Sequence, residues 1–230
     1  MWIKQPYLVV GLTSKLSYYR LDSSYLREVL MIAKLDFHVV NKGMLEGAKK
    51  QVRDNTKIAK STGQVRSRYM LFSRSNPDNL ITLSFWNKQS SQALYIEKVI
   101  EDIKTRNEPD PWQEIVGDEF DVNILAENEA DGEIAIAKID DHIIRKGLEE
   151  QSSAKIIINT TIARNTGAVI HRYNLVSQKN PLRVITLTFW NRESAINEFK
   201  GNAVGASKLI GGESPWTSIE GDTYDVEKLV

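Results

Sequence analysis

Hydrophobic and polar positions in the first half of the chain follow the order strand, helix, strand, strand, helix, strand. Apolar and polar residues alternate over 29–38, as in a half-buried strand, whereas Ala48, Val52 and Ala59 recur at a spacing that suits a helix. An Asn-Pro pair at 76–77 marks the turn of a hairpin. The expected elements are a strand at 29–38, a helix at 44–60, strands at 64–74 and 80–86, a helix at 90–104 and a short strand at 120–125.

The second half of the chain repeats the first. Residues 29–126 align with 133–230 without an insertion or deletion, and 37 of the 98 paired positions are identical. A repeat of this length is a small domain, so each copy is expected to form the same six elements and to end in a short strand, at 224–230 in the second copy. Gly201 and Gly205 fall in the last helix of the second copy, and we expect them to shorten or bend it.

This element order is that of a ferredoxin-like βαββαβ unit of the α+β class. Its helices cover one face of an antiparallel sheet, so the other face needs a partner. We expect the repeats at 29–126 and 133–230, joined by a polar linker at 127–132, to pack their sheets face to face as a barrel within one chain. Pairing of each half with another chain is the alternative. Residues 1–28 are an N-terminal extension, in which residues 7–10 can add an edge strand or the whole region can be a loosely held arm.

Composition narrows the classes of function. Thirty basic and thirty acidic side chains cancel, which argues against a nucleic-acid or membrane-surface partner. There is no cysteine, and only three histidines are present, so no dedicated metal centre is expected. No apolar run approaches 18 residues, and no signal peptide or nucleotide-binding glycine motif is evident. We therefore expect a cytoplasmic protein.

Several short strings recur in both copies: Lys-Gly after the first strand, Thr-Gly after the first helix, Tyr-X-Leu-X-Ser on the second strand, and Phe-Trp-Asn followed by Ser90 or Ser194. Together with the element order they resemble the dimeric α/β-barrel superfamily, and within it the antibiotic-biosynthesis-monooxygenase-like domain. The resemblance covers both repeats.

That resemblance implies a range of activities. The family includes cofactor-independent oxygenases of aromatic polyketides, haem-degrading oxygenases, small-molecule isomerases and proteins without known activity, so the fold alone does not fix the reaction. The haem-degrading branch uses an Asn on the first strand, a Trp on the third and a His on the second helix. Trp86 and Trp190 match the Trp, but neither second helix holds a His. No cofactor is therefore expected.

Candidate catalytic residues lie on the first strand of each copy. Strand geometry places Lys34, Asp36 and His38 on one face, and Lys138, Asp140 and His142 repeat the row. An Asp beside a His can fix its tautomer and make it a proton acceptor, so His38, Asp36, His142 and Asp140 are the candidate catalytic residues. The alternative is a charged ladder across the interface between the two sheets.

The candidate substrate-binding residues follow on later strands. Arg68 and Arg172 can bind a carboxylate or phenolate through a two-pronged contact, or can pair with Asp36 and Asp140. Trp86 and Trp190 can form the floor of an apolar pocket between sheet and helices, or can be core residues. Asn87 and Asn191 can contact substrate, or can cap the second helix.

Three functions are compatible with these residues. The first is a cofactor-independent monooxygenase acting on a small aromatic or enolic compound. The second is a small-ligand-binding or stress-associated barrel without turnover, and the third is a small-molecule isomerase. The expected partner is a small hydrophobic or aromatic molecule; the two repeats pair within the chain, and further homo-oligomerisation remains open.

Overall fold

A computed structural model of the chain describes residues 31–106, 108–210 and 213–230. The predicted edge strand at 7–10 and the rest of the N-terminal extension at 1–28 lie outside these residues. The elements of the first half are β1 (Ile32–Val40), α1 (Leu45–Ser61), β2 (Val65–Ser73), β3 (Asn79–Trp86), α2 (Gln89–Thr105) and β4 (Trp112–Glu127). Those of the second half are β5 (Ile136–Ile144), α3 (Glu149–Arg164), β6 (Val169–Ser177), β7 (Arg183–Trp190), α4 (Ser194–Ile210) and β8 (Trp216–Lys228).

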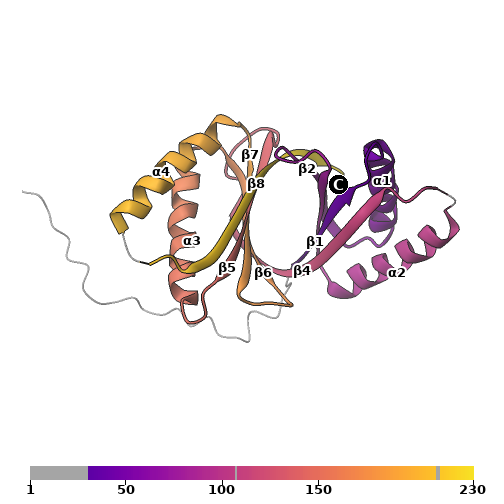
Figure 1. The fold of residues 1–230 in the computed structure, drawn as a ribbon, viewed down its shortest axis with the longest axis horizontal. Helices are drawn as coiled ribbons and strands as arrows, with labels where there is room; N and C mark the ends of the chain where they lie inside the picture. Colours follow the sequence, from indigo (N-terminus) through magenta and orange to yellow (C-terminus); the bar gives the residue numbers. More distant parts are fainter. Residues whose placement is uncertain (1–30, 107, 211–212) are drawn as a thin grey trace, which may run out of the picture.

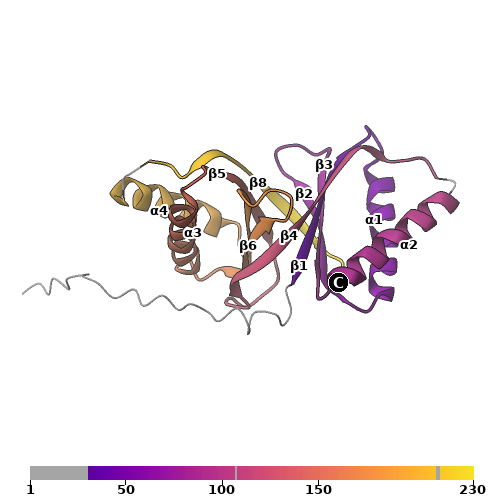
Figure 2. The same ribbon diagram turned by 90° about the horizontal axis from the view of Figure 1, so that it is seen from below.

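The two halves form one closed barrel of eight strands in the order β1-β3-β2-β8-β5-β7-β6-β4, and every neighbouring pair is antiparallel. The four helices lie outside it, α1 and α2 on one side and α3 and α4 on the other (Figure 1). A second view shows the same helix pairs at opposite ends of the molecule with the barrel between them (Figure 2). The predicted α+β fold, an intramolecular α/β barrel of two ferredoxin-like repeats, is confirmed.

The last strand of each half is longer than predicted, and this length closes the barrel. β4 runs for 16 residues where a short strand at 120–125 was expected, and β8 runs for 13. The first part of β4 pairs with β1 and its second part pairs with β6 of the other half. β8 likewise pairs first with β5 and then with β2. Hydrogen bonds therefore join the two sheets at both edges, and side-chain packing between them fills the barrel.

The barrel interior is a single apolar core drawn from both halves. One core cluster contains Leu35, Phe85 and Phe120 of the first half together with Ile139 and Phe189 of the second half. Tyr69 stacks near Phe189 with ring centroids 4.8 Å apart, and Tyr173 lies at the same distance from Phe85. Aromatic pairs therefore cross the interface between the repeats, which stabilises their association.

The expectation that glycines shorten the last helix of the second half is wrong. α4 is continuous over Ser194–Ile210 and as long as α2, 17 residues, despite Gly201 and Gly205. A Cβ added at either glycine would meet nothing within 4 Å, so these positions face open space. The glycine that follows α3 does act as predicted: Gly167 has φ +63°, the left-handed conformation that ends a helix.

Candidate active site in the first half

The row of polar residues on β1 faces the helices and not the barrel interior. Ala33 and Leu35, which alternate with Lys34 and Asp36, are the residues that point into the core. His38 pairs across the sheet with Leu80 of β3 and Ile115 of β4. The alternative expectation, that this row forms a charged ladder between the two sheets, is therefore wrong.

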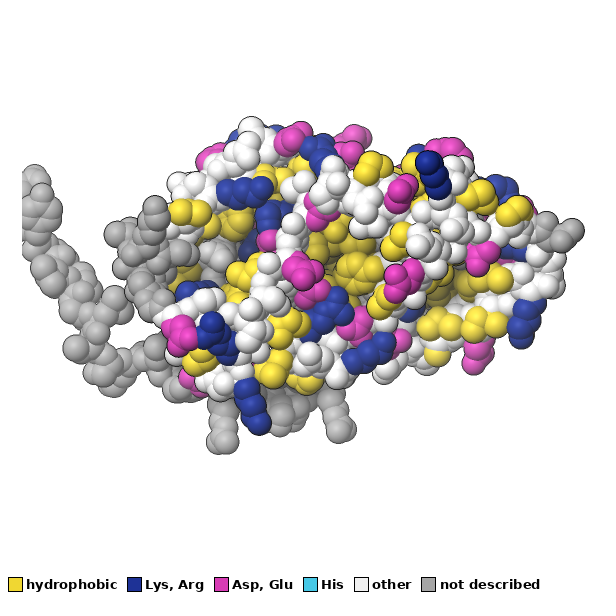
Figure 3. All heavy atoms as spheres, in the orientation of Figure 1, with side chains coloured by type: hydrophobic (Ala, Val, Ile, Leu, Met, Phe, Trp, Pro, Cys, Tyr) yellow, Lys and Arg dark blue, Asp and Glu magenta, His cyan; other side chains and the backbone are white. Residues whose placement is uncertain are grey.

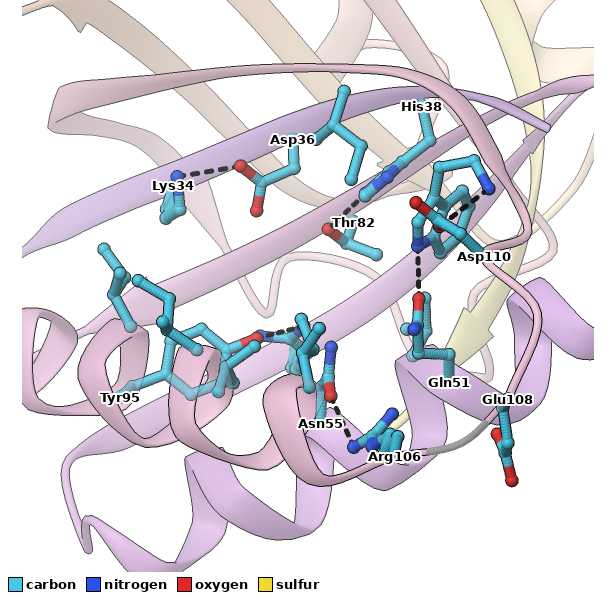
Figure 4. Close-up of a pocket in the computed structure, with 18 residues that line it drawn as sticks. Lys34, Asp36, His38, Gln51, Asn55, Thr82, Tyr95, Arg106, Glu108 and Asp110 are labelled. Carbon is cyan, nitrogen blue, oxygen red and sulfur yellow. Dashed lines mark hydrogen bonds and ion pairs between the residues drawn. The ribbon is translucent and has the colours of Figure 1, made fainter.

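A cavity of about 460 Å³ lies between the sheet and the helices α1 and α2 (Figure 4). In that view Lys34, Asp36 and His38 lie along the strand above the cavity, and Tyr95, Asn55 and Arg106 lie on the helical side below it. One wall is apolar and comes from α2. The residues that line the cavity are Lys34, Asp36, His38, Gln51, Val52, Asn55, Arg68, Thr82, Tyr95, Ile96, Val99, Ile100, Ile103, Arg106, Glu108, Asp110, Trp112 and Ile115.

Lys34 and Asp36 form an ion pair of 2.7 Å on the side of the cavity that the sheet lines. The pair lies against Gly117 of β4: a Cβ at this position would come within 2.5 Å of the Asp36 carboxylate and 2.9 Å of the Lys34 ammonium. The absence of a side chain at Gly117 is what leaves room for the pair. Lys138 and Asp140 form the same ion pair in the second half.

His38 is held by a threonine and not by Asp36. Its Nε2 lies 3.0 Å from Oγ1 of Thr82, and its Nδ1 is buried without a hydrogen-bond partner. Its ring lies 4.3 Å from that of Trp112. The expected arrangement, in which an Asp fixes the tautomer of the His, is wrong because the Asp36 carboxylate is taken by Lys34. His142 repeats this geometry, with Nε2 3.0 Å from Oγ1 of Thr186.

Burial controls the protonation of both histidines. It lowers the pKa of His38 to about 4, since the imidazolium would lose its hydration, and nearby Asp36 offsets only part of this effect. The pKa of His142 is lowered to about 4 for the same reason. Both rings are neutral at pH 7, and each therefore has a nitrogen lone pair to accept a hydrogen bond or a proton.

The two arginines on β2 and β6 are deeply buried, and neither pairs with Asp36 or Asp140 as the alternative expectation required. Arg68 donates from Nη2 to the hydroxyl of Tyr95 at 2.9 Å. Arg172 donates from Nε to Thr160 at 3.1 Å and from Nη1 to Thr188. Burial lowers the pKa of Arg172 to about 10.

Trp86 and Trp190 are fully buried and do not line the cavity. Trp86 donates to Ser84 at 3.0 Å and packs against Tyr95, whose ring centroid is 5.2 Å away. Trp190 has Phe199 as its neighbour at 5.8 Å. Trp86 therefore packs against α2 and Trp190 against α4, as the core alternative proposed, and neither forms the floor of the cavity.

Asn87 and Asn191 lie apart from the cavity. Asn87 is exposed, and the cap of α2 is Lys88, which makes no side-chain capping hydrogen bond. The expectation that Asn87 caps this helix is therefore wrong. The Asn191 amide donates to the carbonyl of Asp131 at 2.8 Å and so ties β7 to the segment between the halves.

Sequence reasoning missed the α2 side of the cavity. Tyr95, Ile96, Val99 and Ile103 line it, whereas the repeat-related positions in the second half hold Phe199, Lys200, Ala203 and Ser207. This part of the repeat is the least similar, with no identical pair between residues 91 and 103. A position-by-position comparison of the two helices was the signal that could have found the difference.

Among the described residues, the cavity presents no set of metal ligands and no free imidazole nitrogen for a haem iron. Within the described ranges no cluster of three His, Cys, Asp or Glu side chains is placed to hold a metal. His38 is the one imidazole that lines the cavity, and its nitrogens are engaged by Thr82 or sealed from the surface. His38 could therefore serve as an axial ligand to haem iron only if its side chain first moved away from Thr82. No helix among the described residues is long and apolar enough to cross a membrane.

Comparison with solved structures finds the same fold in proteins of low sequence identity. A candidate monooxygenase from Fusobacterium nucleatum has a TM-score of 0.69 and 11% identity, with 87% of this chain and 94% of that chain covered. An anthrone oxidase-like protein has a TM-score of 0.57 and 12% identity, with 88% and 94% covered. A mutant chlorite dismutase from Candidatus Nitrospira defluvii has a TM-score of 0.61 and 11% identity, with 90% of this chain and 95% of that chain covered. The chain has the dimeric α/β-barrel fold. No protein-family model and no curated protein matches it.

Proposed function

We propose that the first half of this barrel is a cofactor-independent monooxygenase site for a small aromatic or enolic compound. The observation that carries the proposal is the 460 Å³ cavity, which brings a neutral imidazole, a buried guanidinium and a tyrosine hydroxyl together beside an apolar wall. A cavity of this size suits a ligand of two or three fused rings. The candidate monooxygenase and the anthrone oxidase-like protein share the fold and support the reaction class.

The chemistry needs no reductant when the substrate is an anthrone-type compound. Removal of a proton from the activated CH₂ gives an enolate, which supplies electrons to O₂ and forms a C–O bond. The resulting C–OOH group loses water as its O–O bond breaks, and the carbon becomes a carbonyl. One oxygen atom stays on the product and the other leaves as water. His38 accepts the proton on Nε2, which gives up its contact with Thr82 when substrate is present, and returns it to the peroxide anion to form the C–OOH group.

The burial of His38 limits this role. A pKa of about 4 instead of 6.5 makes protonation of the ring costlier by about 3 kcal/mol. A negative charge that develops on a substrate beside the ring offsets part of this cost, because the imidazolium and the enolate then attract each other in a site of low dielectric. Proton transfer is therefore expected only with substrate in place.

Oxygen consumption tests the proposal. Purified protein is supplied with anthrone-type and hydroxyquinone substrates, and O₂ uptake is measured together with product absorbance. We expect a catalysed rate that falls by about 10²-fold or more in His38→Gln, the size typical of a lost acid–base group. The matched variant His142→Gln should keep the rate within about twofold, well inside that loss. Equal rates in His38→Gln and the unaltered protein would remove His38 from the mechanism.

A second function, binding of the same small molecule without turnover, is favoured by one observation. Asp36 is engaged with Lys34 and leaves His38 without a carboxylate partner, so the site lacks the paired groups common in acid–base catalysis. Binding of aromatic ligands without O₂ uptake from any of them would favour this function over the monooxygenase.

A further inference from the structure

Arg68 carries a buried positive charge without an anionic partner. Its side chain is only 3% exposed, and no carboxylate among the described residues lies within ion-pair distance of it. Of its five N–H groups, one donates to Tyr95, and its buried Nε has no acceptor. Arginine does not lose its proton in proteins, so the charge persists. Burying an unpaired charge costs several kcal/mol, a cost that a bound anion would offset.

The second half provides an internal comparison. Arg172 occupies the repeat-related position and is equally buried, but two threonine hydroxyls accept its hydrogen bonds. One of these is Thr188. In the first half this position is Ser84, whose hydroxyl accepts a hydrogen bond from Trp86 and is not bonded to Arg68. Trp190 correspondingly lacks a partner for its ring N–H. The hydroxyl at this position therefore accepts a hydrogen bond from the arginine in the second half and from the tryptophan in the first half.

The remaining charges around the cavity do not neutralise Arg68. Lys34 is paired with Asp36 at 2.7 Å, and Glu108 with Lys50 at 2.7 Å. Arg106 is paired with Asp102. Asp110 is exposed to solvent at the rim, where water screens it, and accepts the backbone N–H of Trp112 at 3.2 Å. The deep end of the cavity therefore carries a net positive charge.

We propose that the ligand of this cavity is an organic mono-anion, a carboxylate or an ionised enol or phenol, whose charged oxygen contacts Arg68 and Tyr95. The apolar body of this ligand lies along Ile96, Val99 and Ile100 of α2. The inference deepens the proposed function by naming the charge of the substrate, and it rests on the same cavity. Arg68 is the residue that determines this specificity.

Two probes of nearly equal shape test the charge preference. Naphthalene-2-carboxylate carries one negative charge at pH 7.5, and naphthalene-2-carboxamide carries none. Binding of each is measured by calorimetric titration at low salt, without any requirement for turnover. We expect the acid to bind about tenfold tighter or more than the amide, the equivalent of about 1.4 kcal/mol, and Arg68→Gln to abolish this difference. Arg172→Gln should preserve it, because Arg172 is already satisfied.

The variants also report on folding. Arg68→Gln removes an unpaired buried charge and should keep or raise the melting temperature, whereas Arg172→Gln breaks two buried hydrogen bonds and should lower it. If Arg68→Gln fails to fold, Arg68→Met is used in its place. Equal affinity of the unaltered protein for the two probes, a preference that survives in the Arg68 variant, or no binding of the acid up to its solubility limit would overturn the anion site. Oxygen uptake is not measured in this experiment, so its failure is distinct from failure of the monooxygenase proposal.

Discussion

At the scale of single residues, the repeat keeps the ion pair and the histidine–threonine contact of the first strand but changes the partners of its buried arginine. Arg68 and Arg172 occupy equivalent places, and a single exchange of Ser84 for Thr188 accompanies a change in which group each hydroxyl satisfies. A buried hydrogen bond of this kind contributes only about 1 kcal/mol to stability. Its larger consequence is that Arg172 has two hydroxyl acceptors, whereas the guanidinium of Arg68 is left available to the anion that we propose as ligand.

The buried histidines make the stability of the protein depend on pH. His38 and His142 each have a pKa of about 4 in the folded state, below the 6.5 of an unfolded chain. Above pH 6.5 both states are neutral and the histidines contribute nothing to the dependence. As the pH falls from 6.5 towards 4, these histidines become protonated in the unfolded chain but stay neutral in the folded protein. The free energy of unfolding therefore decreases, by about 2 kcal/mol per histidine at pH 5.

Urea denaturation at pH 7.5 and pH 5.0 measures this loss. The double variant His38→Gln, His142→Gln should lose about 4 kcal/mol less stability between the two pH values than the unaltered protein. The acidic residues are the same in both proteins, so their titration cancels in the comparison. An identical pH dependence in the two proteins would show that the histidines are accessible to protons in the folded state.

At the scale of secondary structure, the sequence pattern predicts the type and order of every element within the repeats. It does not predict where β4 and β8 begin. Both strands start eight residues before the expected positions 120 and 224, at Trp112 and Trp216, and the added segments pair with β1 and β5 of their own half. Gly117 and Gly221 lie inside these segments, and glycine is depleted in strands, so the local sequence does not indicate a strand there.

The candidate site was predictable only in part, for a related reason. The alternation along β1 groups Lys34, Asp36 and His38 correctly, and all three line the cavity. The alternation does not show that Asp36 binds Lys34 in preference to His38, because that ion pair depends on the room that Gly117 of the neighbouring strand leaves for it. The α2 residues were missed because Tyr95 and Ile96 fit the apolar face of an ordinary helix.

The glycines of α4 offer a test at the element scale. A Cβ at Gly201 or Gly205 meets nothing within 4 Å, so alanine fits both positions and reduces the entropy of the unfolded chain. Each substitution to alanine should stabilise the protein by about 0.5–1 kcal/mol and raise the melting temperature by about 1–4 °C. As a control, Gly167→Ala should destabilise it by about 1 kcal/mol or more, because φ there is +63°. Melting curves that move down for Gly201→Ala would contradict an unstrained helix at this position.

At the scale of the whole molecule, the inside and the outside of the barrel are built in different ways. The barrel interior is shared, with aromatic pairs that cross between the halves, whereas the space between sheet and helices belongs to each half alone. Hydrophobic side chains on α2 stay exposed beside the cavity: Leu94, Ile100 and Ile103 are 43%, 48% and 46% exposed. The space-filling view shows hydrophobic atoms along the side of the first half where α2 lies (Figure 3). The side chains between sheet and helices can therefore differ between the halves without disturbing the shared core.

Because the core is shared, the two halves are expected to unfold together. Leu35 and Ile139 occupy repeat-related positions in it and are 0% and 3% exposed. Leu35→Ala and Ile139→Ala should each destabilise the protein by about 2–5 kcal/mol. In both variants a single transition should move as a unit, since β4 and β8 tie each sheet to the other by hydrogen bonds. Calorimetry is the direct measurement, and the calorimetric and van't Hoff enthalpies should agree. Two separate transitions, with only the substituted half shifted, would mean that each repeat holds its sheet together without its neighbour.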